Sequence, residues 1–168
     1  QPPSTHNPTL NTLPPQAQTN SGGHVKISID HRGNFTDGPA REVLLGLIEK
    51  VLRYLDLPLQ SELCVSLVSD VDMRELNRHY RQIDATTDVL CFPQGNGVVP
   101  DLLGDIVISY QTAVRHSLKL GITLNEELRL LIVHAVLHLL GFDHKEKKQR
   151  EEMRDKEKEI LDYLSGTY

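Results

Sequence analysis

Three histidines near the C-terminal end of the chain have the spacing to bind one metal ion. His134 and His138 are four residues apart, and His144 follows six residues later. On a helix, residues four apart project from the same face, with about 5–6 Å between their Cβ atoms. Gly141 tolerates the left-handed conformation that ends helices, so the chain can turn there and bring His144 back. Three protein nitrogens with water in an open fourth position are typical of a catalytic zinc site.

Histidines on an apolar helix can instead be core residues with polar partners. The residues around these three are mostly Leu, Ile, Val and Ala, so each imidazole would need its own hydrogen-bond partner. Three histidines at this spacing favour the metal. Structural zinc usually has four protein ligands, so a set of three favours catalysis. We therefore expect one Zn²⁺ per chain, held by His134, His138 and His144.

The residue after the first histidine limits the reaction. The spacing H-x-x-x-H-x-x-G-x-x-H is shared with the metzincin peptidases. Those enzymes carry Glu directly after the first histidine, where it serves as general base for the attacking water. This chain has Ala135 there, which accepts no proton. The sequence thus favours another metal-assisted reaction, and an amidase or peptidase with its base supplied from elsewhere is the first alternative.

Composition indicates one domain with a tail. Residues 1–23 of the 168 contain five prolines and no Asp, Glu, Lys or Arg, which predicts a disordered tail or an engineering remnant before the domain at 24–168. The tail lacks the basic start and apolar core of a signal peptide, and no apolar run approaches the roughly 20 residues that span a bilayer. We expect a cytoplasmic protein that does not bind a membrane. The net charge of −5 counts against a broad phosphate-binding surface.

Hydrophobic periodicity predicts a single domain of mixed α and β structure, with about four strands and about five helices. The expected strands are 25–29, 63–68, 87–92 and 103–109. The expected helices are 39–56, 71–80 with Asp70 as its cap, 110–119, one that opens at a capping box formed by Thr123 and Glu126, and 146–164. The helix after the capping box is apolar nearly all round from Leu128 to Leu140, so we expect a central buried helix carrying the metal-binding histidines, with His144 on the turn that follows it. The alternating charges of 146–162 are typical of a solvated helix face.

Two further segments, Leu76–Pro93 and Leu103–Ser109, carry a family resemblance. They read Asn-x-x-Tyr-Arg, then Thr-Asp-Val-Leu-Cys-Phe-Pro, then Leu-Gly-Asp-Ile. Together with 126–131 and the histidine run, they closely resemble the YbeY family of bacterial endoribonucleases, in the family's order over most of residues 25–145. The family commonly has Ser at the position of Cys91 and often has Gly at that of Ala135.

The resemblance implies an α+β domain with a mixed sheet flanked by helices, and zinc held by the three histidines. It implies cleavage of single-stranded RNA in ribosomal RNA maturation, notably at the 3′ end of the small-subunit RNA, and in ribosome quality control. The implied partners are ribosomal RNA, the ribosome or its small subunit, and assembly proteins. The family's key arginine matches Arg81. Arg81, His134, His138 and His144 are then the expected catalytic residues.

Phosphodiester cleavage needs a nucleophile at neutral pH and positive charge beside the phosphate. Zinc supplies the first and part of the second. Arg81 can supply the rest through paired N–H donors, although a surface salt bridge at a helix end is the alternative for this residue. The nucleophile is either water or the 2′-hydroxyl of the RNA. A non-catalytic ribosome-assembly factor, braced by zinc, is the second alternative function.

Several other polar residues have two interpretations each. Asp143 either orients a ligand imidazole or binds the local backbone. Asp88 and Asp105 either line the cleft or cap turns. Four further residues either form a basic rim that holds phosphates or belong to solvated helix faces: Arg78, Arg115, His116 and Lys119.

Overall fold

The computed structural model describes residues 25–29, 35, 38–39, 41–57, 62–94 and 102–166, so the predicted tail at 1–23 lies outside the described residues. No helix in these ranges is long and apolar enough to cross a membrane. The elements in chain order are β1 (Val25–Ile29), α1 (Arg41–Tyr54), β2 (Glu62–Val68), α2 (Asp70–Arg81), β3 (Val89–Pro93), β4 (Leu102–Ser109), α3 (Tyr110–Leu120), α4 (Leu124–Leu139) and α5 (Lys147–Ser165).

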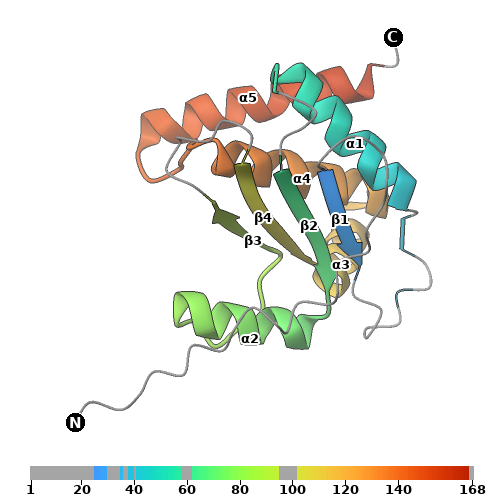
Figure 1. Cartoon of the computed structure of the whole chain (residues 1–168), viewed down its shortest axis with the longest axis vertical. Helices are drawn as coiled ribbons and strands as arrows, with labels where there is room; N and C mark the ends of the chain where they lie inside the picture. The colour runs from blue at the N-terminus through green and yellow to red at the C-terminus, as the bar shows by residue number, and fades with distance from the viewer. Residues whose placement is uncertain are drawn as a thin grey trace.

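The strands form one mixed sheet in the order β1-β2-β4-β3. Strand β2 runs parallel to both β1 and β4, whereas β3 pairs antiparallel with β4 at the end of the sheet. Figure 1 shows α1, α4 and α5 on one side of the sheet and α2 on the other. The predicted class, a single α+β domain with a mixed sheet flanked by helices, is confirmed.

Helix α4 lies at the centre of the larger hydrophobic core. Half of its sixteen residues are buried, including Ile132 and Val136 at 0 % exposure, so α4 is the central buried helix that the sequence predicts. They pack with residues of α1, α5 and one face of the sheet. On the other face, α2 contributes Met73 to a smaller cluster with Leu90 of β3. The sheet is thus covered heavily on one face and by a single helix on the other.

Both ends of α4 follow the local rules that its sequence predicts. The Thr123 side chain accepts from the Glu126 N–H at 3.1 Å, and the Glu126 carboxylate accepts from the Thr123 N–H at 2.7 Å. At the other end, the Gly141 N–H donates to the carbonyl of His138, and the Phe142 N–H donates to that of Leu137, both at 3.0 Å. These two bonds form a Schellman motif, with Gly141 at φ 95°. The chain therefore reverses just before His144.

The prediction that Asp70 caps α2 is wrong. Ser69 is the N-cap, and its hydroxyl accepts from the Asp72 N–H. Asp70 instead lies in the first turn and accepts from the side chains of Ser109, Thr112 and Arg115 at 2.6–2.7 Å. Desolvation alone would raise the pKa of Asp70, but these hydrogen bonds outweigh it and lower the pKa to about 2. Asp70 thereby joins α2 to the start of α3.

Replacing Gly104 by alanine is expected to be far more destabilising than the same change at Gly141. Both have positive φ, but a Cβ at Gly104 would overlap the carbonyl oxygen of Phe92, whereas one at Gly141 meets nothing within 4 Å. We expect a loss above about 3 kcal/mol for Gly104→Ala, from strain plus the clash, against about 1–2 kcal/mol for Gly141→Ala, from strain alone. Chemical denaturation of both variants measures this. Equal losses would contradict the close approach of β3 to β4.

Candidate metal and phosphate site

Two of the three predicted histidines converge at the end of α4. The Nε2 atoms of His134 and His138 lie 3.1 Å apart, because positions four apart share one helix face. The ring centroids are 4.6 Å apart for this pair, 5.0 Å for His138 and His144, and 6.3 Å for His134 and His144. His134 and His138 are partly buried, whereas His144 is exposed on the turn after Gly141. The fold thus brings all three rings to one place.

A carboxylate that the sequence reading missed orients the first histidine. Glu157 of α5 makes a short hydrogen bond to Nδ1 of His134. A carboxylate at Nδ1 fixes the proton there, which leaves Nε2 with a lone pair that faces His138. The sequence contained a signal, since the apolar residues Met153 and Ile160 lie four positions before and three after Glu157, on the same helix face. Both are buried in the structure, at 2 % and 0 % exposure. Glu157 therefore lies on the packed side of a helix that we expected to be a solvated charged face.

His138 is held in its neutral form, which is the form that binds metals. Burial is the largest cause that lowers its pKa, and the neighbouring His134 and His144 lower it further. Asp143 and a backbone hydrogen bond at Phe142 act in the opposite direction without reversing the shift. A neutral imidazole keeps one nitrogen lone pair for a cation.

The donor set fits zinc in type, and the pair His134–His138 fits it in distance. With Zn–N bonds of about 2.0–2.1 Å and tetrahedral angles, two ligand nitrogens lie about 3.3 Å apart, close to the 3.1 Å between these Nε2 atoms. Within the described ranges, no three His, Cys, Asp or Glu side chains are already arranged to hold an ion. His144 is the histidine that lies apart, because its ring is farther from that of His134 than the ring of His138 is. Binding of three nitrogens thus requires the His144 ring to come closer to that of His134.

Of the two interpretations of Asp143, the structure shows binding to the local backbone. Its carboxylate accepts from the backbone N–H of His144 at 2.7 Å, and this hydrogen bond is the main reason that its pKa is lowered. Lys145 lies 3.8 Å from the same carboxylate. The carboxylate that orients an imidazole is Glu157, on another helix.

Arg81, the last residue of α2, differs from the other two arginines of this helix. Arg74 pairs with Asp84 at 2.9 Å, and Arg78 pairs with Glu75 at 2.6 Å. Arg81 is exposed and makes no ion pair within the part of the chain that the structure describes. The alternative of a surface salt bridge therefore has no support among the described carboxylates.

Cys91 of β3 links Arg81 to the histidines. Burial raises the pKa of the Cys91 thiol to about 11, and the positive charge of Arg81 partly opposes that rise. The Sγ atom of Cys91 lies 3.9 Å from the carbonyl oxygen of Ala135, next to His134. Cys91 thus contacts the histidine helix and is affected by the charge of Arg81, and we take Arg81 and the histidines together as the candidate site.

The predicted basic rim is not a free cationic surface. Arg115 pairs with Asp70 at 2.7 Å, His116 lies 3.4 Å from the buried carboxylate of Glu127, and Arg78 pairs with Glu75. Lys119 is exposed at the end of α3. Asp88 stabilises a turn, since its side chain accepts from the Val89 N–H at 2.8 Å. Asp105 accepts from the Gln94 amide at 2.8 Å, and burial raises its pKa.

Fold and site together define a small α+β protein with a histidine cluster at the end of its central helix. Residues 28–165 match the family described as Endoribonuclease YbeY. A relative of that name from Chelativorans sp. is 38% identical over 147 residues, which cover 83% of this chain and 90% of the relative. One from Aquifex aeolicus is 41% identical over 125 residues, covering 70% and 83%. The chain therefore belongs to the YbeY family.

A solved structure agrees with this assignment. The solution structure of a Thermotoga maritima protein superposes with a TM-score of 0.61 at 28% identity, covering 84% of this chain and 89% of that one. The resemblance inferred from the sequence motifs is thus confirmed by the comparisons.

Proposed function

We propose that this protein is a zinc-dependent endoribonuclease that cleaves single-stranded RNA. The observation that carries the proposal is Arg81, an arginine without an ion pair among the described residues, whose charge acts on Cys91, the strand residue that contacts the histidine helix. Membership of a family whose relatives are named endoribonucleases supports the same reaction. By this family relationship, the substrate is ribosomal RNA, matured at the 3′ end of the small-subunit RNA and in quality control, in the cytoplasm and with ribosomal assembly proteins as partners.

In this proposal, His134, His138 and His144 hold one Zn²⁺. When bound, zinc activates a nucleophile at neutral pH and offsets negative charge on the phosphodiester. Glu157 keeps the His134 ring in the tautomer whose Nε2 is free to bind. Burial keeps His138 neutral. The exposed turn after Gly141 gives His144 the freedom to approach.

Arg81 binds the non-bridging oxygens of the scissile phosphate. The guanidinium presents N–H donors in a planar fork that matches two phosphate oxygens, and these bonds strengthen as charge develops on them. An arginine already held by a carboxylate would have to break that pair first. Arg81 has no such pair to break among the described residues, whereas Arg78 has one.

The peptidase alternative conflicts with Ala135. This residue is at 0 % exposure and carries no group that accepts a proton, at the position where a metzincin has its glutamate. The test compares the purified protein on unstructured RNA, on duplex RNA and on casein, beside an Arg81→Ala variant prepared identically. We expect cleavage of unstructured RNA alone, and by the wild type alone. Turnover of casein would support the peptidase, and a zinc-loaded protein inert on every substrate would support an assembly factor.

Replacing Glu157 by alanine is expected to weaken zinc binding by about 10–100-fold, the usual effect of losing the carboxylate that orients a ligand histidine. The reason is that the His134 ring loses the partner that fixes its tautomer. Competition with a chromogenic chelator measures the affinity. Glu152→Ala is the matched control, since Glu152 lies on the same helix and, among the described residues, pairs with Lys148 at 4.0 Å rather than with a histidine. Equal affinities of the two variants would leave Glu157 without a role in the metal site.

A further inference from the structure

Tyr80, an exposed aromatic residue of α2, directly precedes Arg81 in the chain. Tyr80 is 41 % exposed, so a large part of its ring faces solvent. Its ring lies edge-to-face with Phe92 of β3, with 5.0 Å between the centroids. His79 contacts it from the same helix at 4.7 Å. Tyr80 is therefore held between two rings while a large part of its own surface faces solvent.

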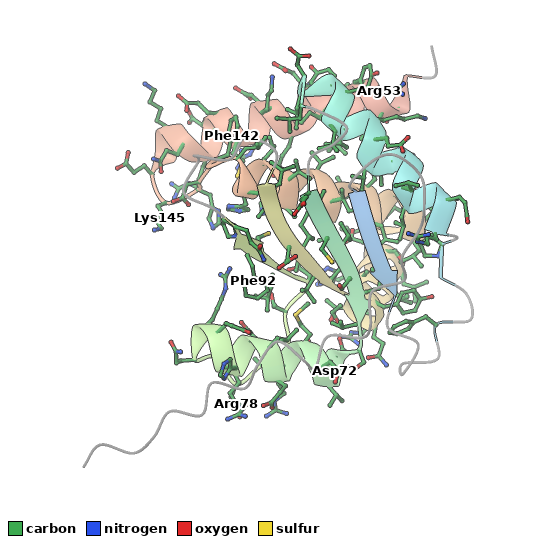
Figure 2. All side chains as sticks on the ribbon, in the orientation of Figure 1. Arg53, Asp72, Arg78, Phe92, Phe142 and Lys145 are labelled. Atoms are coloured by element: carbon green, nitrogen blue, oxygen red, sulfur yellow. The ribbon has the colours of Figure 1, made fainter. Side chains whose placement is uncertain are left out.

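The same strand connects Tyr80 to the candidate site. Phe92, which supports Tyr80, follows Cys91 in β3. The two side chains lie on opposite faces of the sheet, since Cys91 packs with the core around α4 and contacts Ala135, whereas Phe92 packs with the smaller cluster on the α2 side. Figure 2 shows Phe92 between α2 and the turn that carries Phe142 and Lys145, which is the turn that presents His144. Tyr80 thus lies on the α2 side of the edge strand β3, and it directly precedes the residue that we assign to the phosphate.

We propose that Tyr80 stacks on a base of the RNA strand whose phosphate Arg81 binds, and that this contact selects single strands. The inference rests on the proposed function and adds a binding residue to it. Every base has a flat face that stacks on an aromatic ring, so the contact needs no particular sequence. A base inside a duplex is already stacked on both sides and has no face to offer. Phe92 and His79 fix the ring in advance, which lowers the entropic cost of binding.

The charge and shape of the surroundings indicate what kind of molecule binds at Tyr80. The arginine next to Tyr80 is unpaired among the described residues, while the two earlier arginines of α2 are neutralised by Asp84 and Glu75. An aromatic face beside one available guanidinium fits a nucleotide, which presents a flat base and an anionic phosphate together. An apolar protein partner would leave the guanidinium without a counterion.

The first test is a pair of substitutions read by steady-state cleavage of unstructured RNA. Tyr80→Ala should raise KM by about 5- to 100-fold, the range of one lost base–aromatic stack, with a much smaller change in kcat. Tyr80→Phe keeps the ring and should behave like the wild type. Preference for single strands over duplexes should fall in Tyr80→Ala, since only the single-strand complex loses a contact. Tyr163→Ala is the control, because Tyr163 is similarly exposed, at 44 %, and also packs on another ring, that of Tyr54.

The second test does not depend on activity or on metal. The sequence contains no tryptophan, so Tyr80→Trp and Tyr163→Trp each introduce a single fluorophore. With a chelator present to prevent cleavage, a short oligoadenylate should quench the emission of Tyr80→Trp by stacking and leave that of Tyr163→Trp unchanged. A duplex of the same length should quench neither. This readout also decides the matter if Tyr80→Ala fails to fold.

The outcomes separate this inference from the proposed function. If the wild type cleaves RNA and Arg81→Ala does not, but Tyr80→Trp is not quenched and Tyr80→Ala has the wild-type KM, then the stacking role is wrong and the nuclease stands. If oligoadenylate quenches Tyr80→Trp while the zinc-loaded wild type cleaves no RNA, then RNA binds there and the catalytic proposal fails.

Discussion

Replacing Arg81 by alanine is expected to lower cleavage of single-stranded RNA by about 10²-fold or more, the scale measured when one donor to a developing oxyanion is removed. The physical reason is that Arg81 has no ion pair among the described residues and that its charge acts on Cys91, which contacts the histidine helix. Its full charge is therefore available to the phosphate. Single-turnover kinetics, with RNA and protein mixed at fixed zinc content, measure the effect on the chemical step.

Two companion variants make the Arg81 experiment decisive. Arg81→Lys should restore little activity, because an ammonium lacks the planar fork that binds two oxygens. Arg78→Ala is the matched control, since Arg78 lies on the same helix, is exposed, and is already paired with Glu75. The circular dichroism spectrum and zinc content of all three variants should equal those of the wild type. Wild-type cleavage by Arg81→Ala would show that Arg81 is a surface residue.

Replacing His138 by alanine is expected to remove most of the bound zinc and, with it, the activity. One of only three proposed protein ligands is lost, and it is the one whose Nε2 lies 3.1 Å from that of His134. Metal analysis of protein purified without chelator or histidine tag should find about one equivalent in the wild type and little in the variant. The effect should exceed that of Glu157→Ala, which removes a supporting residue and leaves the three nitrogens in place.

The control for His138 is a histidine outside the cluster. His79 is exposed on α2 and packs on Tyr80, so His79→Ala should keep its full zinc content. Full zinc in His138→Ala would contradict the proposed ligand set. Loss of zinc from both variants would point to adventitious binding by surface imidazoles.

The histidine helix and its two ends were determined by the sequence alone, because the interactions behind them join residues close together in the chain. The capping box of α4 joins Thr123 to Glu126, three residues later, and the Schellman turn needs only Gly141 at the correct position. The four-residue spacing of His134 and His138 likewise fixes their common face on any helix. These short-range rules predicted the histidine helix, its two ends and the gathering of the three rings, and the motifs predicted the family.

The tertiary structure alone decided the polar partnerships between side chains that lie far apart in the chain. Glu157 reaches His134 across 23 positions of the chain, whereas the neighbouring Asp143 binds its own backbone. Asp70 meets Ser109 39 positions away instead of capping its helix. Such contacts depend on how helices pack around the sheet, and several carboxylates compete for each cation at little difference in local energy. Arg78 is neutralised by a local pair with Glu75, three residues earlier in the same helix. Only the tertiary structure shows that Arg81 has no ion pair among the described residues.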